Sequence, residues 1–246
     1  MAVLVHIADL SFNAGGISPR WMLDITAGWD QPDLDSDPLA TLVEGSADGR
    51  IMPRHRTIVC DGVMSARTEA DHWDAYYRLS SLVPIRDEVV FQVDEPGTPK
   101  LAYVKATAGN PRIRTHNGLM FEFSLTLRAN EPRKYAATPT VVPIPAGGSA
   151  TFTSAGRTSS PVTVTATSAG TVDVGGSVAG HRLVADSVPA GSVLDSRART
   201  IRTSAGLDLF TALAPGFEWL VVVPGEQTIT NDGTADLSLS FSDAWL

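Results

Sequence analysis

The segment from Phe121 to Tyr135 constrains the fold of this chain more than any other. Apolar and polar residues alternate from Phe121 to Arg128, which is the two-residue period of a strand with one buried face. Pro132 lacks the N–H group that a strand ladder needs, so the strand is expected to end near Asn130.

The composition changes directly after Tyr135. Residues 136–160 are rich in Ala, Thr, Pro, Gly and Ser, a composition typical of a domain boundary. A chain of 246 residues is long enough for two modest domains that each bury a core. The sequence therefore predicts two domains, residues 1–136 and residues 137–246.

The first domain is predicted to contain strands and one helix. Thr68 begins the helix, with Asp71 in the place of the glutamate of a capping box, and Pro84 ends it. An apolar stripe on the helix is expected to pack against a sheet. The stripe consists of Trp73, Tyr76, Tyr77, Leu79 and Leu82. Strands are expected at residues 3–7, 21–26, 56–63, 88–93, 101–107 and 119–128, and Asn117-Gly118 indicates a hairpin turn.

The second domain is predicted to be all-β. Short strand-like segments recur there, separated by Gly, Pro, Asn and Asp, as in a β-sandwich. They lie at residues 161–167, 182–185, 192–195, 200–203, 219–223, 227–230 and 236–241. The predicted fold class is therefore mainly β, with one helix in the first domain and a β-sandwich in the second.

Charge and composition argue against several classes of protein. The formal net charge is −8 and both domains are acidic, whereas recognition of a nucleic-acid backbone needs a concentrated positive surface. No apolar run approaches the roughly 20 residues of a membrane span, and no secretory signal is expected at the N-terminus. Cys60 is the single cysteine, so we expect a buried thiol and no intramolecular disulfide.

No motif in the sequence predicts an active site. The sequence has no Gly-x-Ser-x-Gly elbow, no phosphate-binding glycine-rich loop and no His-Glu-x-x-His, and its five histidines are scattered. We therefore expect no catalytic residues, no cofactor and no bound metal.

One acidic segment matches the spacing of a calcium loop. Asp33, Asp35, Asp37 and Glu44 stand at the first, third, fifth and twelfth positions of an EF-hand loop. Pro38 occupies the position where glycine permits the sharp turn, and the flanks carry glycines and Pro32 instead of long amphipathic helices. We interpret the segment as an acidic surface loop with chance spacing.

The order of several short motifs resembles the distal tail protein of siphophages, over nearly the whole chain. The motifs lie at residues 56–64, 68–83, 102–106, 121–135, 190–195, 199–201, 219–225, 228–230 and 243–246. Asn130-Glu-Pro departs from the commoner Ala-Asp-Pro of the family, but it keeps the proline that stops the strand.

The resemblance implies a structural virion protein. In that family the N-terminal domain, a β-barrel-like fold with one helix, assembles into a six-fold ring that continues the tail tube. The C-terminal domain, a galectin-like β-sandwich, lies outside, where it can hold receptor-binding or other baseplate proteins. The resemblance thus implies a homohexamer made in the host cytoplasm and located at the tail tip of the virion.

The resemblance also implies particular partners. The tail tube protein would bind one face of the ring, and a tail-tip or tail-associated lysin-like hub protein the other. Neither sequence-specific nucleic-acid binding nor membrane insertion is implied. The acidic composition of residues 1–136 suggests a ring lumen that repels passing DNA.

Two other functions stay open at this point. A carbohydrate-binding, host-adhesion module would use aromatic rings of the second domain, with Trp219 and Trp245 as the stacking residues. The alternation from Phe217 to Leu220 instead predicts a strand in which Trp219 packs inward. An enzyme such as a cell-wall hydrolase is the third alternative, and no motif favours it.

Overall fold

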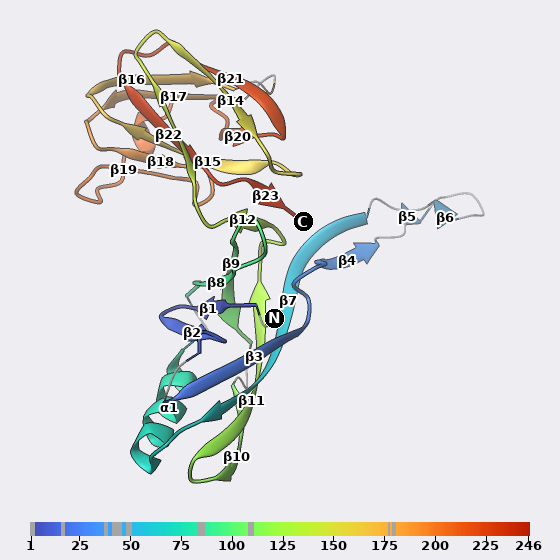
Figure 1. Ribbon diagram of the computed structural model, residues 1–246. Helices are drawn as coiled ribbons and strands as arrows, with labels where there is room; N and C mark the ends of the chain where they lie inside the picture. Colours follow the sequence, from blue (N-terminus) through green and yellow to red (C-terminus); the bar gives the residue numbers. More distant parts are fainter. Residues whose placement is uncertain are drawn as a thin grey trace. The chain divides into compact units, whose positions relative to one another are not determined.

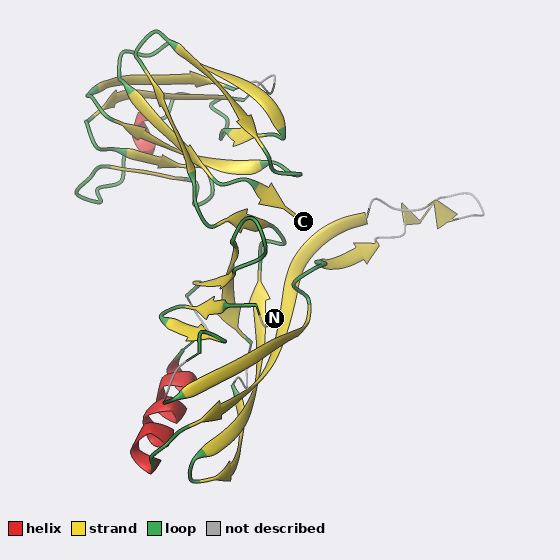
Figure 2. Cartoon of the chain, viewed as in Figure 1, coloured by secondary structure: helices red, strands yellow, loops and turns green. Residues whose placement is uncertain are grey.

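The structure is a computed structural model, and it describes residues 3–15, 18–36, 39–40, 46–47, 51–82, 87–107, 111–176, 178 and 181–246. The chain forms two compact units, Met1–Ala137 and Thr138–Trp245 (Figure 1). Strands dominate both units, and the described residues contain a single α-helix (Figure 2). The expected mainly-β fold is confirmed. Within these residues, no helix combines the length and the apolar character needed to cross a membrane.

The first unit is built on antiparallel strands in the order β2–β1–β8–β9–β11–β7–β3. These strands are β1 (Val5–Ile7), β2 (Leu10–Phe12), β3 (Arg20–Ala27), β7 (Ile51–Ser65), β8 (Val89–Val93), β9 (Lys100–Ala106) and β11 (Met120–Ala129). Additional pairings are β4 (Asp33–Ser36) with β7, β10 (Arg112–Asn117) with β11, β12 (Lys134–Ala136) with β9, and β5 (Leu39–Ala40) with β6 (Ser46–Ala47).

Asn13, which follows β2, forms hydrogen bonds to β3, so it connects the first and last strands of this order. Its backbone N–H donates to the Trp21 carbonyl at 3.1 Å. Its side-chain amide donates to the Leu23 carbonyl at 2.8 Å and accepts from the Leu23 N–H at 3.0 Å. Asn13 has a φ of 62°, a left-handed conformation that asparagine tolerates better than most residues. The sheet therefore curls back on itself, in the barrel-like manner expected for this domain.

The core of the first unit lies on the apolar side of β11. Phe121 and Leu127 are fully buried there, and Phe123 and Leu125 nearly so, which confirms the predicted alternation. The strand ends at Ala129, next to the predicted end at Asn130. Asn117 and Met120 are paired across the turn between β10 and β11, so the predicted hairpin turn is also confirmed.

Helix α1 (Glu69–Ser81) begins as predicted, and part of the predicted stripe packs on the core: Leu79 and Leu82 are buried and Tyr76 packs against the same core. Thr68 is the N-cap, and its hydroxyl accepts the Asp71 N–H at 3.1 Å. His72, Ala75 and Leu79 are buried, whereas Trp73 and Tyr77 are 46% and 66% exposed. The prediction that these two aromatic rings pack on the sheet was wrong, because residues 72, 75 and 79 share a helix face that 73 and 77 do not. Pro84 lies outside the described residues.

The second unit consists of two packed sheets with a separate core. One sheet has the order β13–β22–β15–β18–β19 with β20 on β15, and the other the order β14–β21–β16–β17. The first sheet comprises β13 (Thr140–Ile144), β15 (Ser160–Ala166), β18 (Val193–Asp195), β19 (Thr200–Arg202), β20 (Val221–Val222) and β22 (Leu237–Phe241). The second comprises β14 (Ser149–Ser154), β16 (Gly170–Gly175), β17 (Arg182–Val188) and β21 (Gly225–Asn231), and the unit also contains the short strand β23 (Ala244–Trp245) and a single 3₁₀ turn at Phe210–Ala212.

Some strands of the second unit differ from the sequence-based expectation. β13 and β14 lie inside residues 136–160, which were interpreted as a boundary. The strand predicted at residues 219–223 is reduced to Val221–Val222. The preceding residues instead follow a turn and use the backbone N–H of Glu218 to bond to the Arg182 carbonyl at 2.8 Å.

Candidate functional site

The outer face of the first unit's sheet carries its most unusual arrangement of charge. Strands β3, β7, β11 and β10 are neighbours, and the side chains opposite the core face solvent. One cross-strand row contains Asp24, Asp61, Ser124 and Arg112, and the next contains Met22, Val63, Glu122 and Arg114. Asp24 and Asp61 therefore lie on the β3–β7 side of this face, Glu122 lies on β11, and two arginines lie on β10.

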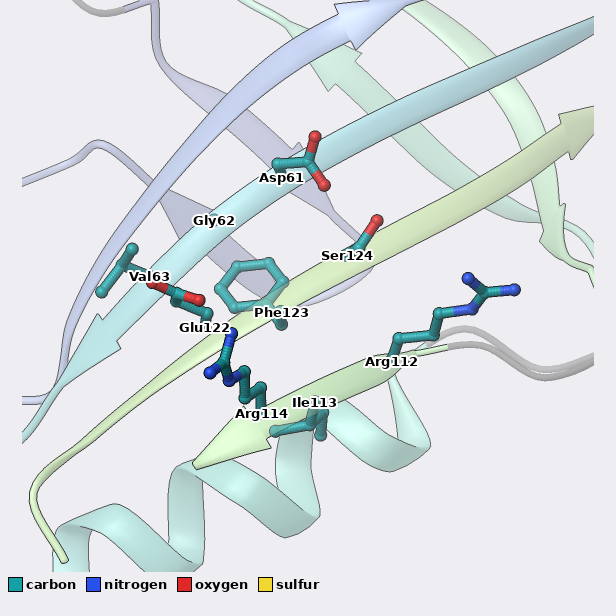
Figure 3. A pocket seen from close by; sticks show the side chains of 9 residues that line it. All are labelled: Asp61, Gly62, Val63, Arg112, Ile113, Arg114, Glu122, Phe123 and Ser124. Atoms are coloured by element: carbon teal, nitrogen blue, oxygen red, sulfur yellow. The ribbon is translucent and has the colours of Figure 1, made fainter. Parts of the chain in front are cut away.

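A hollow of about 530 Å³ lies over this part of the sheet (Figure 3). It is lined by Asp61, Gly62, Val63, Arg112, Ile113, Arg114, Glu122, Phe123 and Ser124. On the core side of the same sheet, Gly62 makes room for the buried Phe123 ring, because a Cβ at this position would stand 2.2 Å from its Cζ. Figure 3 shows that Arg112 and Arg114 project from β10, while Asp61 and Glu122 belong to the two neighbouring strands.

Most of the charges around the hollow lack a partner in the part of the chain that the structure describes. Glu122 is paired with His116, whose Nε2 lies 2.9 Å from Oε1. Among the described residues, Asp61, Arg112 and Arg114 make no ion pair or side-chain hydrogen bond, and the same holds for Asp24. This face can therefore offer charges of both signs to another molecule.

A second polar arrangement is buried and internally satisfied. The Arg56 side chain is fully buried, at 0% exposure. Its Nη1 donates to the carbonyls of Gly28 and Trp29, and its Nε and Nη2 donate to the carbonyl of Pro132. Burial lowers the pKa of Arg56, and the negative charges of Asp30, Asp33 and Glu95 oppose that shift. The guanidinium thus fastens the loop after β3 to the proline that stops β11.

Glu95 continues this buried arrangement. Its carboxylate accepts the Trp29 Nε1–H at 2.6 Å and the Lys100 ammonium at 2.5 Å. Lys134 lies 3.6 Å from the same carboxylate, and its Nζ stands 4.9 Å from the centre of the Trp29 ring. Burial alone would raise the pKa of Glu95, but the hydrogen bonds from Lys100 and Trp29 and the charge of Lys134 outweigh it and lower the pKa.

These contacts explain the sequence from Asn130 to Tyr135, which follows strand β11. Pro132 supplies the carbonyl for Arg56, and Lys134 supplies the cation above Trp29. The Tyr135 hydroxyl donates to the Glu131 carboxylate, which Arg133 also contacts at 3.0 Å. Because the polar groups satisfy one another, this cluster stabilises the unit and leaves no reactive group free for catalysis.

The calcium-like spacing falls partly on a strand. Asp33 and Asp35 lie in β4, which pairs with β7. One carboxylate oxygen of Asp33 accepts the Thr57 hydroxyl at 2.7 Å and lies 3.0 Å from the His55 Nε2. The segment is thus a paired strand at this point and not the surface loop that was expected. Asp37 and Glu44 lie outside the described residues, and the described part of the chain contains no cluster of three side chains able to hold a metal.

The two candidate sugar-stacking tryptophans are both half-buried. Trp219 packs against the second core, and its ring is perpendicular to that of Phe217, with the centroids 5.4 Å apart. The Trp219 carbonyl oxygen also lies 3.0 Å from the His181 Nδ1. Trp245 lies in β23. The aromatic ring that is most open to solvent in this region is Phe210, at 50% exposure.

The sequence did not predict the arginines on the charged outer face or Glu95 in the buried polar cluster. Strand β10 was not predicted, although Ile113 between two arginines and the following Asn117-Gly118 turn together indicate the first strand of a hairpin. Glu95 was missed because two of its three partners, Trp29 and Lys134, are distant in sequence, and Lys100 nearby does not by itself indicate the cluster.

Comparison with solved structures identifies the fold. The crystal structure of the SPP1 Dit protein, described as a paradigm of the hub adsorption apparatus in phages that infect Gram-positive bacteria, superimposes with a TM-score of 0.64. The alignment covers 100% of both chains at 16% sequence identity. The chain has the fold of the SPP1 Dit protein. The likeness to the distal tail protein expected from sequence is thus confirmed for the fold.

Two further structures share this Dit-like fold. They are the phage P2 baseplate in its activated conformation with calcium (TM-score 0.63, 9% identity, covering 99% of this chain and 98% of that one) and the same baseplate with strontium (TM-score 0.61, 10% identity, covering 97% of each chain). No protein-family model and no curated protein matches the sequence.

Proposed function

We propose that the chain is a structural component of a phage tail, located at the tail tip of the virion. It would form a hexameric ring at the distal end of a long non-contractile tail and link the tail tube to the tip or baseplate. The observation that carries this proposal is the end-to-end superposition on the SPP1 Dit protein, which spans both units of the chain. A likeness confined to one sandwich would carry much less, because such folds host many unrelated functions.

The division of the chain into two units supports distinct roles for them. The first unit would form the ring, with the tail tube protein on one face and a lysin-like hub protein on the other. The second unit would hold receptor-binding proteins. The charged outer face of the first unit supports self-association, because a ring requires two different, complementary patches on each copy.

A structural role without enzymatic activity agrees with the chemistry of the described residues. Their buried polar cluster is satisfied internally, and the charged hollow contains no nucleophile hydrogen-bonded to a base. Zymography on host cell wall provides the check, and lysis by the purified chain would contradict this part of the proposal.

The solution mass tests the proposed ring. Size-exclusion chromatography with light scattering, near neutral pH and at high protein concentration, should give about six times the chain mass of 26.0 kDa. Negative-stain images of the same fraction should show rings with a central opening. A strict monomer that also fails to bind purified tail tubes would contradict the proposal.

The carbohydrate-binding alternative receives no support from Trp219. The Trp219 side chain packs against the core of the second unit, which gives its indole ring a structural role. Trp245 is the other candidate stacking residue. Glycan binding by the full chain and by its Trp245→Ala variant, compared on a glycan array, tests whether Trp245 binds carbohydrate. Glycan binding that is lost in the variant, with the fold retained, would revive the carbohydrate-binding alternative.

A further inference from the structure

The outer face of the first unit carries an acidic pair and a basic pair of residues at opposite margins, with Glu122 between them on β11 and Arg20 at the start of β3. Asp24 and Asp61, on β3 and β7, form the acidic margin, and Arg112 and Arg114, on β10, form the basic margin. All four side chains are exposed. The row Asp24–Asp61–Ser124–Arg112 connects the two margins directly across four strands.

The two margins are too far apart to neutralise each other. Three strand spacings separate Asp24 from Arg112 in that row, which amounts to about 14 Å. An ion pair needs contact within about 4 Å, and screening at physiological ionic strength acts over about 8 Å. These four residues form no ion pair with any described residue, and Glu122, the cross-strand neighbour of Arg114, is paired with His116 instead.

Each margin also places like charges side by side. Asp24 and Asp61 are direct cross-strand partners in the register of β3 and β7, an arrangement that destabilises a sheet when both are charged. Arg112 and Arg114 are two residues apart on one strand and therefore project from the same face. A second molecule that supplies positive charge would relieve the repulsion between Asp24 and Asp61, and one that supplies negative charge would pair with Arg112 and Arg114.

The strand edges at the two margins differ. Among the described strands, β10 pairs only with β11, so its other edge is open. The outer edge of β3 is instead occupied at Trp21 and Leu23 by hydrogen bonds from Asn13. A neighbour at β3 would therefore make contacts through side chains, because Asn13 already uses the backbone groups that an added strand would need.

We propose that the basic margin of one copy contacts the acidic margin of the next copy, with Arg112 and Arg114 facing Asp24 and Asp61. This inference rests on the proposed self-association and assigns the surfaces that carry it. The contact is heterologous, so repetition leads to a ring or a filament. The alternative face-to-face dimer would enclose the 530 Å³ hollow of each copy between the subunits, whereas protein interfaces are close-packed.

Charge reversal tests the contact. The variants Arg112→Glu/Arg114→Glu and Asp24→Arg/Asp61→Arg should each associate about tenfold or more weakly than the unmodified chain, by sedimentation velocity over a concentration series. A chain that carries all four substitutions should regain association, because both margins are then reversed together. Arg157→Glu/Arg202→Glu, on exposed positions of the second unit, matches the first variant in net charge and should associate normally.

Cross-linking tests the same contact when association is weak. Arg112→Lys/Arg114→Lys places amines on the basic margin, and a zero-length carbodiimide reagent joins an amine to a carboxylate in direct contact. A mixture of ¹⁴N- and ¹⁵N-labelled protein should yield mixed-isotope cross-links from positions 112 or 114 to Asp24 or Asp61.

The outcomes separate this contact from the proposed function. Oligomers that persist in both reversal variants would overturn the contact and leave the ring standing. Dimers that never grow larger would overturn the contact and the ring together. A chain that stays monomeric at every concentration and gives no mixed-isotope cross-link would overturn the contact and the self-association together. If association is lost in each reversal variant and recovers in the chain with all four substitutions, the result supports both the contact and the self-association.

Discussion

Arg56 donates from Nε and Nη2 to the carbonyl of Pro132, 76 residues further along the chain, at 3.1 and 2.8 Å. The same guanidinium binds the carbonyls of Gly28 and Trp29. One buried side chain thereby holds two loops of the first unit together, the one after β3 and the one after β11. The proline that stops β11 is thus also a fixed point of the tertiary structure.

Arg56→Met should destabilise the first unit by about 3 kcal/mol, because it leaves three carbonyls without their buried donor. Pulse-labelled hydrogen exchange in urea, read on peptides from β7 and β11, measures the loss in that unit alone. Arg202→Met, on an exposed position of β19, should change stability by less than about 0.5 kcal/mol. Equal urea midpoints for the two variants would contradict the role assigned to Arg56.

Glu95 should make the first unit sensitive to acid. Its pKa is lowered in the folded chain, so its contribution is present above its unfolded pKa, near 4.5, and is lost as the pH falls through the folded value. Glu95→Gln should therefore be less stable than the unmodified chain at pH 7, and the difference should shrink toward pH 3. Thermal unfolding across this range provides the measurement.

The matched control for this pH dependence is Glu226→Gln, on an exposed position of β21. Its stability should follow that of the unmodified chain at every pH. A constant difference between Glu95→Gln and the unmodified chain from pH 7 to pH 3 would show that the carboxylate charge is not what stabilises this cluster.

Cys60 should be unreactive in the folded chain. Burial raises its pKa to about 12, and the charges of Asp61 and Asp24 add to the shift. An aromatic disulfide reagent at pH 8 should label Cys60 only after urea unfolds the first unit, because the thiolate is the reactive form. The stabilising effect of the buried thiol is present below the unfolded pKa near 9.0 and should be lost as the pH rises toward about 12.

A second thiol provides the control for that labelling. Ser204→Cys in a Cys60→Ala background places the thiol on an exposed position, and it should react at once in the folded chain. Immediate labelling of Cys60 in the unmodified chain would mean that the strand β7 opens far more readily than its burial indicates.

Gly28 should tolerate substitution much less than Gly97. Both have positive φ angles, 82° and 98°. A Cβ at Gly28 would stand 1.7 Å from the Thr57 carbonyl oxygen, whereas nothing lies within 4 Å at Gly97. Gly97→Ala should lower the free energy of unfolding by about 1 kcal/mol, from backbone strain alone. Gly28→Ala should lower it by about 3 kcal/mol or more, because the loop must also move. Similar unfolding free energies for the two variants, measured by urea denaturation, would contradict this reading of the loop.

Patterns that are local in sequence determined much of this protein. The alternation from Phe121 to Arg128, the N-cap at Thr68 and the turn at Asn117-Gly118 each predicted the structure that forms, because the chemistry that decides them lies within a few residues. The same applies to the strand-stopping Pro132, whose missing N–H acts at its own position.

The tertiary structure alone decided which charges are buried and which are presented together. Nothing near Arg56 in sequence predicts its burial, since its partners lie 27 to 76 positions away. The half-buried Glu95 likewise depends on Trp29, 66 positions away. Strand register brought Asp24 beside Asp61 and placed Arg112 at the other end of the same row. Helix packing likewise buried His72 in place of Trp73, because the geometry of the partner sheet, and not the hydrophobicity of one stripe, selects the face that is covered.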